Sequence, residues 1–372
     1  MPATVAQFIQ LLDRIAPPRL AEAWDNVGLQ IGSLTWPVEK VWTALDPLPE
    51  VVDRACENGV GLLVTHHPLI FKPIRRIEAD STVGRIARAA LSQQLAIVAA
   101  HTNLDSVPGG LNDALAERMG LVDVRALAGQ LDPKMLKVVV FVPATHVRAV
   151  LEAMFTVEAG HIGNYTCCSF RCDGTGTFLP GQAARPVVGR TGHLNEVQES
   201  RIEMVVSNDQ LDSLLKAIRQ AHPYESVACD IYPLQETTSA AGLGRVGELA
   251  GPISLQTLAA CLKSTLKLAT VKVVGHLSSQ VKRVALCSGS GASLAGAAMA
   301  AGAQVYISGD LGYHTAREAQ QANMALIDIG HFGSEHLMVD LLAASLRESI
   351  ARAGISATVD ACGMETDPFH YR

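Results

Sequence analysis

Three apolar segments of this chain each end in histidine, and two of these histidines are followed by a carboxylate four residues later. The residues are His66 and His67 after segment 61–65, His101 and Asp105 after segment 95–100, and His331 and Glu335 after segment 325–330. Imidazole nitrogens and carboxylate oxygens are ligands that suit zinc, iron, manganese, cobalt and nickel. Buried strands that end in these residues would bring them to one edge of a sheet. The pattern therefore predicts a metal site.

His331 and Glu335 lie where a strand is expected to give way to a helix. Residues four apart lie on one face of a helix, so both side chains can reach one ion. The N-terminus of the helix also favours the ionised carboxylate, which is the form that binds metal. Taken alone, this pair is better explained as an ordinary helix start with an acidic first turn.

His66 and His67 would point to opposite faces of a regular strand. At the end of a strand, where Pro68 bends the chain, both can enter one cavity, and two metal ions are the simplest reason for two imidazoles there. Taken alone, the pair is better explained by one hydrogen-bonded core histidine and one exposed histidine.

Asp105 adds a carboxylate, whose two oxygens can bridge two cations. Its alternative role is an Asx turn or a helix cap. His101 is the weaker ligand candidate, and we expect it to orient another ligand from behind. The ligands predicted from the residues are therefore His66, His67, Asp105, His331 and Glu335.

Considered together, the three polar strand ends favour a dinuclear centre over the separate alternatives. Two divalent cations bring four positive charges, and two carboxylates leave two of these uncancelled. A bridging hydroxide would cancel another and would be a nucleophile at neutral pH. Calcium and magnesium fit less well, because they prefer shells made only of oxygen atoms.

A fourth apolar segment, 305–308, leads into two further candidates. Asp310 follows this segment, and His314 comes four residues later at an expected helix start. We expect both to line the pocket, with capping and surface roles as the alternative. The stretch Ser288–Gly291 follows a strand and precedes a helix, so its amides could hold an anion such as phosphate.

The elements that would position these residues follow an α/β pattern. Apolar strands alternate with helical segments in residues 1–130 and again in residues 239–372, which indicates a parallel-rich sheet flanked by helices. Residues 131–238 predict a ferredoxin-like (βαββαβ) α+β domain, with a hairpin that turns at Asp173-Gly174. We therefore expect one split α/β unit interrupted by an inserted domain.

Composition limits the partners and the location. Hydrophobic residues make up 48% of the chain, charged residues 18%, and the formal net charge is −6. This balance gives no electrostatic support for binding a nucleic acid polymer or an anionic membrane. The N-terminus lacks the regions of a signal peptide, and no segment reaches the roughly 18 apolar residues of a membrane helix. We expect a cytoplasmic protein with no membrane partner.

Five motifs, in the same order, resemble the Nif-three-like family, whose members are also named GTP cyclohydrolase I type 2 homologues. They are Trp24-Asp-Asn-Val-Gly28-Leu, Thr65-His-His-Pro-Leu-Ile-Phe71, Ala100-His-Thr-Asn-Leu-Asp105, Gly309-Asp-Leu-Gly-Tyr-His314 and Asp328-Ile-Gly-His-Phe-Gly-Ser-Glu335. The middle segment resembles the insert of the longer members. The resemblance implies two metal ions on the five ligands named above, and a homohexamer whose metal sites face an internal cavity.

Two functions fit these observations. The first is a metal-dependent hydrolase in which a bridging hydroxide attacks a small molecule, with Asp310 or His314 moving a proton. A nucleotide such as GTP is the substrate that the family name suggests. The second is a non-enzymatic metal chaperone or regulatory protein whose insert senses a ligand or a partner. Turnover of nucleotides would favour the first, and rapid exchange of metal with an acceptor protein the second.

Overall fold

The computed structural model describes residues 2–131, 135–162, 165–234 and 238–370. The chain divides into two compact units: unit 1 is residues 1–130 with 239–372, and unit 2 is residues 131–238. Each unit has an apolar core of its own. None of the described helices is both long enough and apolar enough to span a membrane.

The first sheet of unit 1 has five strands in the order β17-β4-β5-β6-β2. Strands β17, β4, β5 and β6 are parallel, and β2 is antiparallel at the edge. The bounds are β2 Gly28–Ile31, β4 Lys40–Ala44, β5 Leu62–Thr65, β6 Ala96–Ala99 and β17 Thr358–Ala361. Every residue of β5 and β6 is buried, which explains why both strands are apolar without alternation.

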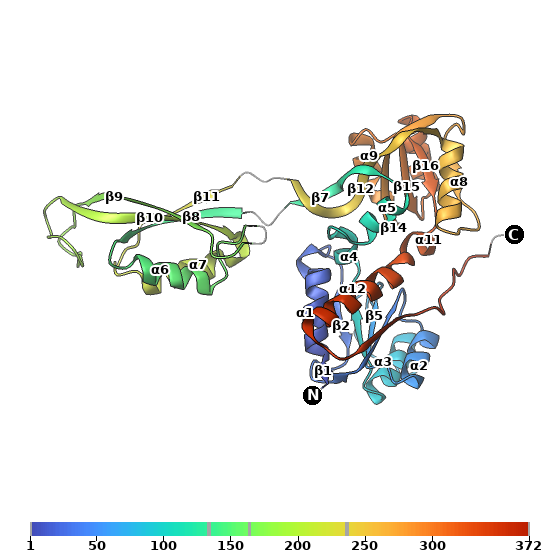
Figure 1. Ribbon diagram of the computed structural model, residues 1–372, viewed down its shortest axis with the longest axis horizontal. Helices are drawn as coiled ribbons and strands as arrows, with labels where there is room; N and C mark the ends of the chain where they lie inside the picture. Colours follow the sequence, from blue (N-terminus) through green and yellow to red (C-terminus); the bar gives the residue numbers. More distant parts are fainter. Residues whose placement is uncertain (1, 132–134, 163–164, 235–237, 371–372) are drawn as a thin grey trace. The chain divides into compact units, whose positions relative to one another are not determined.

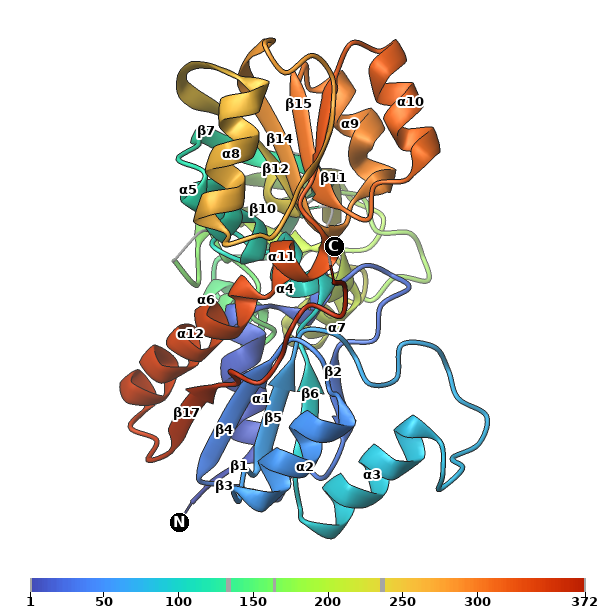
Figure 2. The same ribbon diagram turned by 90° about the vertical axis from the view of Figure 1, so that its right-hand side faces the viewer.

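Helices cover both faces of this sheet (Figure 2). They are α1 Val5–Ile15, α2 Pro49–Glu57, α3 Thr82–Ser92 and α12 Leu337–Ala353. Leu62 and Val64 of β5 pack in the core that α1 and α12 share, whereas Leu63 packs with α2 and α3. Successive residues of a strand point to opposite faces, so this apolar run supplies both cores.

The second sheet of unit 1 has six strands in the order β13-β16-β15-β14-β12-β7. Strands β14, β15 and β16 are parallel, while β12 and β13 pair antiparallel with β14 and β16. The strand bounds are β7 Val122–Leu131, β12 Thr238–Ser254, β13 Lys272–Val274, β14 Gln280–Ser290, β15 Val305–Gly309 and β16 Ala325–Asp328. The helices that follow these strands, or that lie near them, are α4 Thr102–Ser106, α5 Leu111–Arg118, α8 Leu255–Thr265, α9 Ala295–Ala300, α10 Tyr313–Gln321 and α11 His331–Glu335.

Unit 1 thus contains two sheets where we expected one. The two halves of its chain exchange strands: β7 comes from the first half and joins the second sheet, and β17 comes from the second half and joins the first. Each sheet is therefore completed only by both halves. Short elements complete the unit: β1 Ala3–Thr4, β3 Pro37–Val38 and the 3₁₀ turns Pro18–Leu20 and Ala292–Leu294.

Unit 2 consists of one antiparallel sheet, in the order β11-β8-β10-β9, with two helices on one face (Figure 1). Its elements are β8 Met135–Pro143, α6 Val147–Thr156, β9 Ser169–Phe178, β10 Asn195–Ser207, the 3₁₀ turn Asn208–Gln210, α7 Leu211–Ala221 and β11 Cys229–Pro233. Ile202, Met204 and Val206 alternate along β10 and enter the core beneath α6 and α7.

The predicted hairpin turn at Asp173-Gly174 was wrong. Strand β9 runs straight through both residues and pairs with β10, so that Asp173 lies opposite Ser200 and Gly174 opposite Glu199. The Ser200 hydroxyl donates a hydrogen bond to Asp173 Oδ1 at 2.6 Å, which stabilises the extended pairing. Asp-Gly is a turn signal only when the flanking strands pair with each other.

Candidate metal centre

Four histidines of unit 1 lie just beyond the carboxyl ends of strands in both sheets. His66 and His67 follow β5, and His101 follows β6, in the five-stranded sheet. His331 begins α11, three residues after β16 of the six-stranded sheet ends, and Gly330 makes this turn with φ +77°. Only glycine adopts this conformation freely. The cluster therefore forms where the ends of two sheets face each other, and not along one edge as we expected.

His66 is fully buried and presents an unpaired nitrogen to two carboxylates. Its Nδ1 lies 2.9 Å from the carbonyl oxygen of Ala100, so this nitrogen is the donor. Its Nε2 lies 3.7 Å from Asp105 Oδ1 and 3.7 Å from Glu335 Oε1 and has no hydrogen-bond partner among the described residues. A buried polar atom without a partner is unfavourable. A cation at this position would satisfy the nitrogen and both carboxylates.

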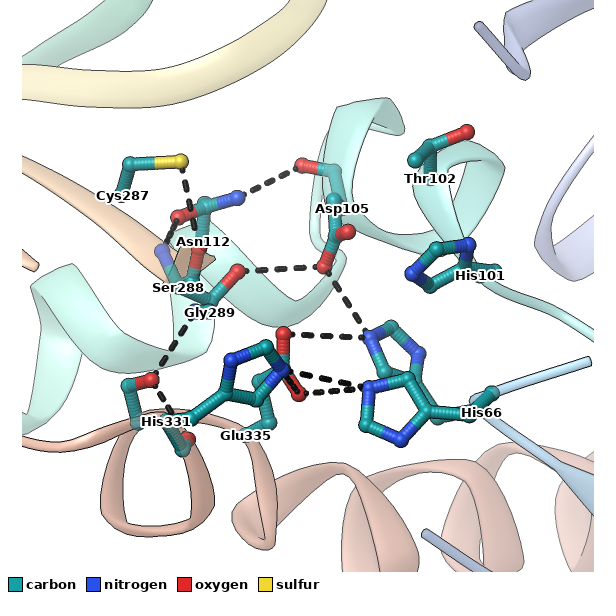
Figure 3. A network of polar contacts seen from close by, with 12 residues as sticks. His66, His101, Thr102, Asp105, Asn112, Cys287, Ser288, Gly289, His331 and Glu335 are labelled. Carbon is teal, nitrogen blue, oxygen red and sulfur yellow. Dashed lines mark hydrogen bonds and ion pairs between the residues drawn. The ribbon is translucent and has the colours of Figure 1, made fainter. Parts of the chain in front are cut away.

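His67, His331 and Glu335 form a second close group. Glu335 Oε2 lies 3.0 Å from His67 Nε2 and 2.9 Å from His331 Nε2, and the two nitrogens are 3.3 Å apart. The ligand atoms of this group lie within 4.8 Å of one another, and so do those of His66, His67 and His101. His67 belongs to both groups. Figure 3 shows the side chains converging on one space from separate elements.

In three of the four imidazoles, Nδ1 lies within hydrogen-bond distance of an aspartate oxygen. Asp46 Oδ1 lies 2.8 Å from His67 Nδ1, Asp310 Oδ2 2.7 Å from His331 Nδ1, and Asp25 Oδ1 2.9 Å from His101 Nδ1. An acceptor at Nδ1 places the proton there and leaves Nε2 free for a metal, which is the usual arrangement behind ligating histidines. The cluster thus has the tautomers that a cation requires.

The sequence indicated only part of this supporting layer. Asp310 was expected to line the pocket, but the roles of Asp25 and Asp46 were not recognised. Asp46 follows β4, the neighbour of β5 in the sheet, so its position just after a buried strand was the available signal. Asp25 lies in one of the family motifs, directly after Trp24.

Glu365, in the C-terminal segment, supports the backbone next to the cluster, and the sequence did not indicate this role. Glu365 accepts hydrogen bonds from the amides of Leu45 and Asp46, at 2.8 and 2.7 Å. This carboxylate holds the backbone that carries Asp46, and Asp46 in turn orients His67. Glu365 is 320 positions from Leu45 in the chain, and no local pattern connects the two residues.

The carboxylates strongly favour positive charge in the cluster. Hydrogen bonding to Glu335 raises the pKa of His331 to about 9. Burial alone would lower the pKa of His67, but Asp46 and Glu335 raise it to about 10. Burial would raise the pKa of Glu335, but the surrounding imidazoles hold it well below its ordinary value. Protons balance the carboxylates when no metal is bound, and divalent cations would replace them.

The glycine-rich stretch Ser288–Gly291 supports the ligands and does not form an anion site. The Ser288 hydroxyl donates to Asp105 Oδ1 at 3.1 Å, and a Cβ on Gly289 would collide with the Glu335 carboxylate. The amides of this stretch are already used: Ser288 N donates to Asn112 Oδ1, Gly289 N to Ser334 Oγ and Gly291 N to Ser308 Oγ. The expectation that these amides bind phosphate is therefore not supported.

Two cavities of unit 1 reach the cluster. The larger, of about 650 Å³, is lined by His67, His101, Asp105, His331 and Glu335, among others. The smaller, of about 370 Å³, lies on the side of Asp46 and Asp310 and also touches His67 and His331. His314 lines neither cavity; it is exposed on α10 with its ring 5.6 Å from that of Tyr313. The structure thus brings together every predicted ligand, His101 and Asp310, but not His314.

Relatives of known sequence resemble this chain over almost its full length. A protein of Halalkalibacterium halodurans named GTP cyclohydrolase 1 type 2 homolog is 39% identical over 363 residues, which are 98% of this chain and 97% of that protein. A Bacillus subtilis protein of the same name is 36% identical over 365 residues, 98% of each chain.

Solved structures give the same result. A Bacillus cereus protein related to NIF3 superposes with a TM-score of 0.83 at 38% identity and covers both chains completely. A Staphylococcus aureus protein superposes with a TM-score of 0.85 at 33% identity, over 100% of this chain and 99% of that one. The model of the family Duf34/NIF3 (NGG1p interacting factor 3) matches residues 3–368. Sequence, architecture and family model agree, and the chain belongs to the Duf34/NIF3 family.

Proposed function

We propose that this protein is a metal-dependent hydrolase with a dinuclear metal centre. One observation carries the proposal: four imidazole Nε2 atoms and two carboxylates converge, and an acceptor holds each Nδ1 from behind. Ligating histidines almost always donate their other ring N–H to such an acceptor, which fixes the tautomer and the orientation of the ring. The proposed ligands are His66, His67, Asp105, His331 and Glu335, and His101 joins them as a candidate because it belongs to one of the close groups.

The arrangement of ligand atoms supports two ions. The two groups of ligand atoms overlap only in His67, and Glu335 directs one oxygen towards His66 and the other towards His67 and His331. A carboxylate in this position can serve two cations. Mixed nitrogen and oxygen ligands suit zinc, iron, manganese, cobalt or nickel.

Such cations, when bound, would activate water at neutral pH and stabilise negative charge on a substrate. The residues of the chain have complementary roles. Ser288 holds Asp105, and Asp310 holds His331 in the orientation that exposes Nε2. Asp310 is therefore better suited to positioning than to moving protons, and His314 lies outside both cavities.

The names of the relatives suggest the class of substrate. Several are called GTP cyclohydrolase 1 type 2 homolog, so we propose a small molecule such as a nucleotide as the substrate. We further propose that unit 2 is a ferredoxin-like domain, because its βαββαβ order and sheet order β11-β8-β10-β9 fit that arrangement. A cytoplasmic homohexamer completes the proposal, on the basis of the family resemblance.

Metal analysis of protein purified without chelators or metal-affinity columns tests this function. We expect about two transition metal ions per chain, and loss of both metal and nucleotide hydrolysis in a His67→Ala, Glu335→Gln double variant that keeps its circular dichroism spectrum. Glu348→Gln is the matched control, since Glu348 is an exposed residue paired with Arg352 on α12. Full metal content in the double variant would refute the site. Metal binding without turnover of any nucleotide would favour a metal chaperone or regulatory protein.

A further inference from the structure

The larger cavity has two exposed aromatic side chains in its wall. Trp24 is 58% exposed and Phe71 is 48% exposed, although their ring centroids are only 5.7 Å apart. Both rings also lie edge-on to His101, at 6.0 and 6.4 Å. Large apolar side chains that stay exposed together beside a cluster of polar ligands indicate a surface for binding an apolar or aromatic group.

The rest of this cavity is apolar or carries hydroxyl groups. Leu243, Leu294 and Pro68 contribute apolar surface, and several serine and threonine hydroxyls lie among them. Glu22, Asp105 and Glu335 contribute carboxylates, beside the imidazoles of His67, His101 and His331. Among the described residues that line the cavity, none is lysine or arginine.

The side chains of this lining offer little of their own to a polyphosphate. Besides metal ions, proteins hold phosphate groups with arginine, lysine or free backbone amides at a helix N-terminus. The described part of the cavity wall contains neither lysine nor arginine, and the amides of Ser288, Gly289 and Gly291 already donate hydrogen bonds within the protein. By contrast, a flat heteroaromatic ring stacks on tryptophan and phenylalanine, and hydroxyl groups can bond to its edge.

We infer that the substrate is a flat heteroaromatic compound of the nucleobase or nucleoside class, bound through its ring by Trp24 and Phe71, and that a triphosphate is not the part recognised. This inference rests on the proposed function, because the ring would be presented to the histidine and carboxylate cluster. It adds a specificity: the aromatic wall selects the ring, and the described lining offers no lysine or arginine to hold the phosphates. A cavity of about 650 Å³ is of ordinary size for such a ligand.

Guanosine and GTP are the probes that test the inference, because they share one base and differ in the triphosphate. Their dissociation constants are to be measured by calorimetry on the full chain, with its metal content determined on the same samples. We expect guanosine to bind at least as tightly as GTP. Trp24→Ala and Phe71→Ala should each weaken guanosine binding by roughly tenfold, the usual loss of a stacking partner, without changing the metal content.

Phe170→Ala is the matched control, because Phe170 is a 64% exposed aromatic residue of unit 2. This variant should bind guanosine like the unaltered protein. Tighter binding of GTP by tenfold or more would overturn the inference, as would unchanged guanosine binding in both cavity variants or failure of both probes to bind at concentrations on the order of 1 mM. Failure of the proposed function appears separately, as protein that holds no metal.

Discussion

A buried histidine is found in each unit of this protein, and the two differ in how their nitrogens are satisfied. In unit 2, His222 Nε2 lies 2.9 Å from the carbonyl oxygen of Phe141, and its Nδ1 accepts the amide of Tyr224 at 3.1 Å. In unit 1, His66 has one such partner at Nδ1, and its Nε2 is left between two carboxylates. Burial alone therefore does not distinguish structural histidines from ligand candidates; an unpaired nitrogen that faces two carboxylates does.

The same difference extends to the surroundings of the two histidines. Among the described residues of unit 2, the buried polar side chains are Ser200 and His222. Unit 1 buries many more among its described residues, including His66, Asp105, Ser288, Ser334 and Glu335 of the cluster and its support. Polar burial is unfavourable unless each group is paired. We attribute its concentration in unit 1 to the proposed metal centre.

The largest expected difference between the two units is in their response to pH. In metal-free protein the pKa of His67 is raised to about 10 and that of His331 to about 9, whereas burial lowers the pKa of His222. Histidines with raised pKa values stabilise the fold fully below their ordinary pKa, and this contribution is lost as pH rises through about 9 and 10. Metal must displace both protons, so its affinity should rise roughly a hundredfold per unit between pH 6 and 8.

Calorimetry in buffers of different ionisation enthalpy measures this effect. About two protons should be released per chain on metal uptake near pH 7. His222→Gln is the control, because a neutral histidine in unit 2 should not change the number of protons released. Heat changes that do not depend on the buffer would contradict the prediction and the contrast between the two histidines.

Removal of metal should lower the local stability of unit 1 and leave the stability of unit 2 unchanged. A ligand present at a hundred times its dissociation constant stabilises a fold by about 2.7 kcal/mol, so a chelator should accelerate local amide exchange in unit 1 by up to roughly a hundredfold. Hydrogen exchange with mass spectrometry should show the change at β5, β6 and α11, while β8 and β10 of unit 2 keep their protection. A uniform change in both units, or no change in unit 1, would contradict this prediction.

A smaller effect is expected for the supporting layer. Glu365→Gln and Asp46→Asn should each weaken metal binding by roughly tenfold, because each loosens the orientation of His67. If Glu365 acts through Asp46, the double variant should bind metal as tightly as the single variant that has the lower metal affinity. Metal titration of the three proteins measures this, with Asp360→Asn on the exposed side of β17 as the control. Additive losses would show that Glu365 acts by another route.

Local patterns in the sequence predicted most elements of unit 1. The apolar segments 61–65 and 95–100 form the strands Leu62–Thr65 and Ala96–Ala99, as expected. Strands β7 and β12 were not predicted, because Gly129 of β7 and the glycines of β12 indicated loops. The Asp173-Gly174 turn was wrong because β9 continues through both residues and pairs with β10. Asn195, which pairs with Phe178 at the end of β9, lies 17 positions further along the chain, so a long loop and not a tight turn joins the two strands.

Residue types alone showed which side chains have the chemistry of metal ligands and which segments are apolar enough to be buried, because both properties are local. That His66, His101 and His331 come from two sheets whose ends face each other was visible only in the folded structure. The folded structure also shows that Asp25, Asp46 and Asp310 hold the imidazoles and that Glu365 holds Asp46. These contacts join segments far apart in the chain, and their geometry follows from packing, which no local pattern records.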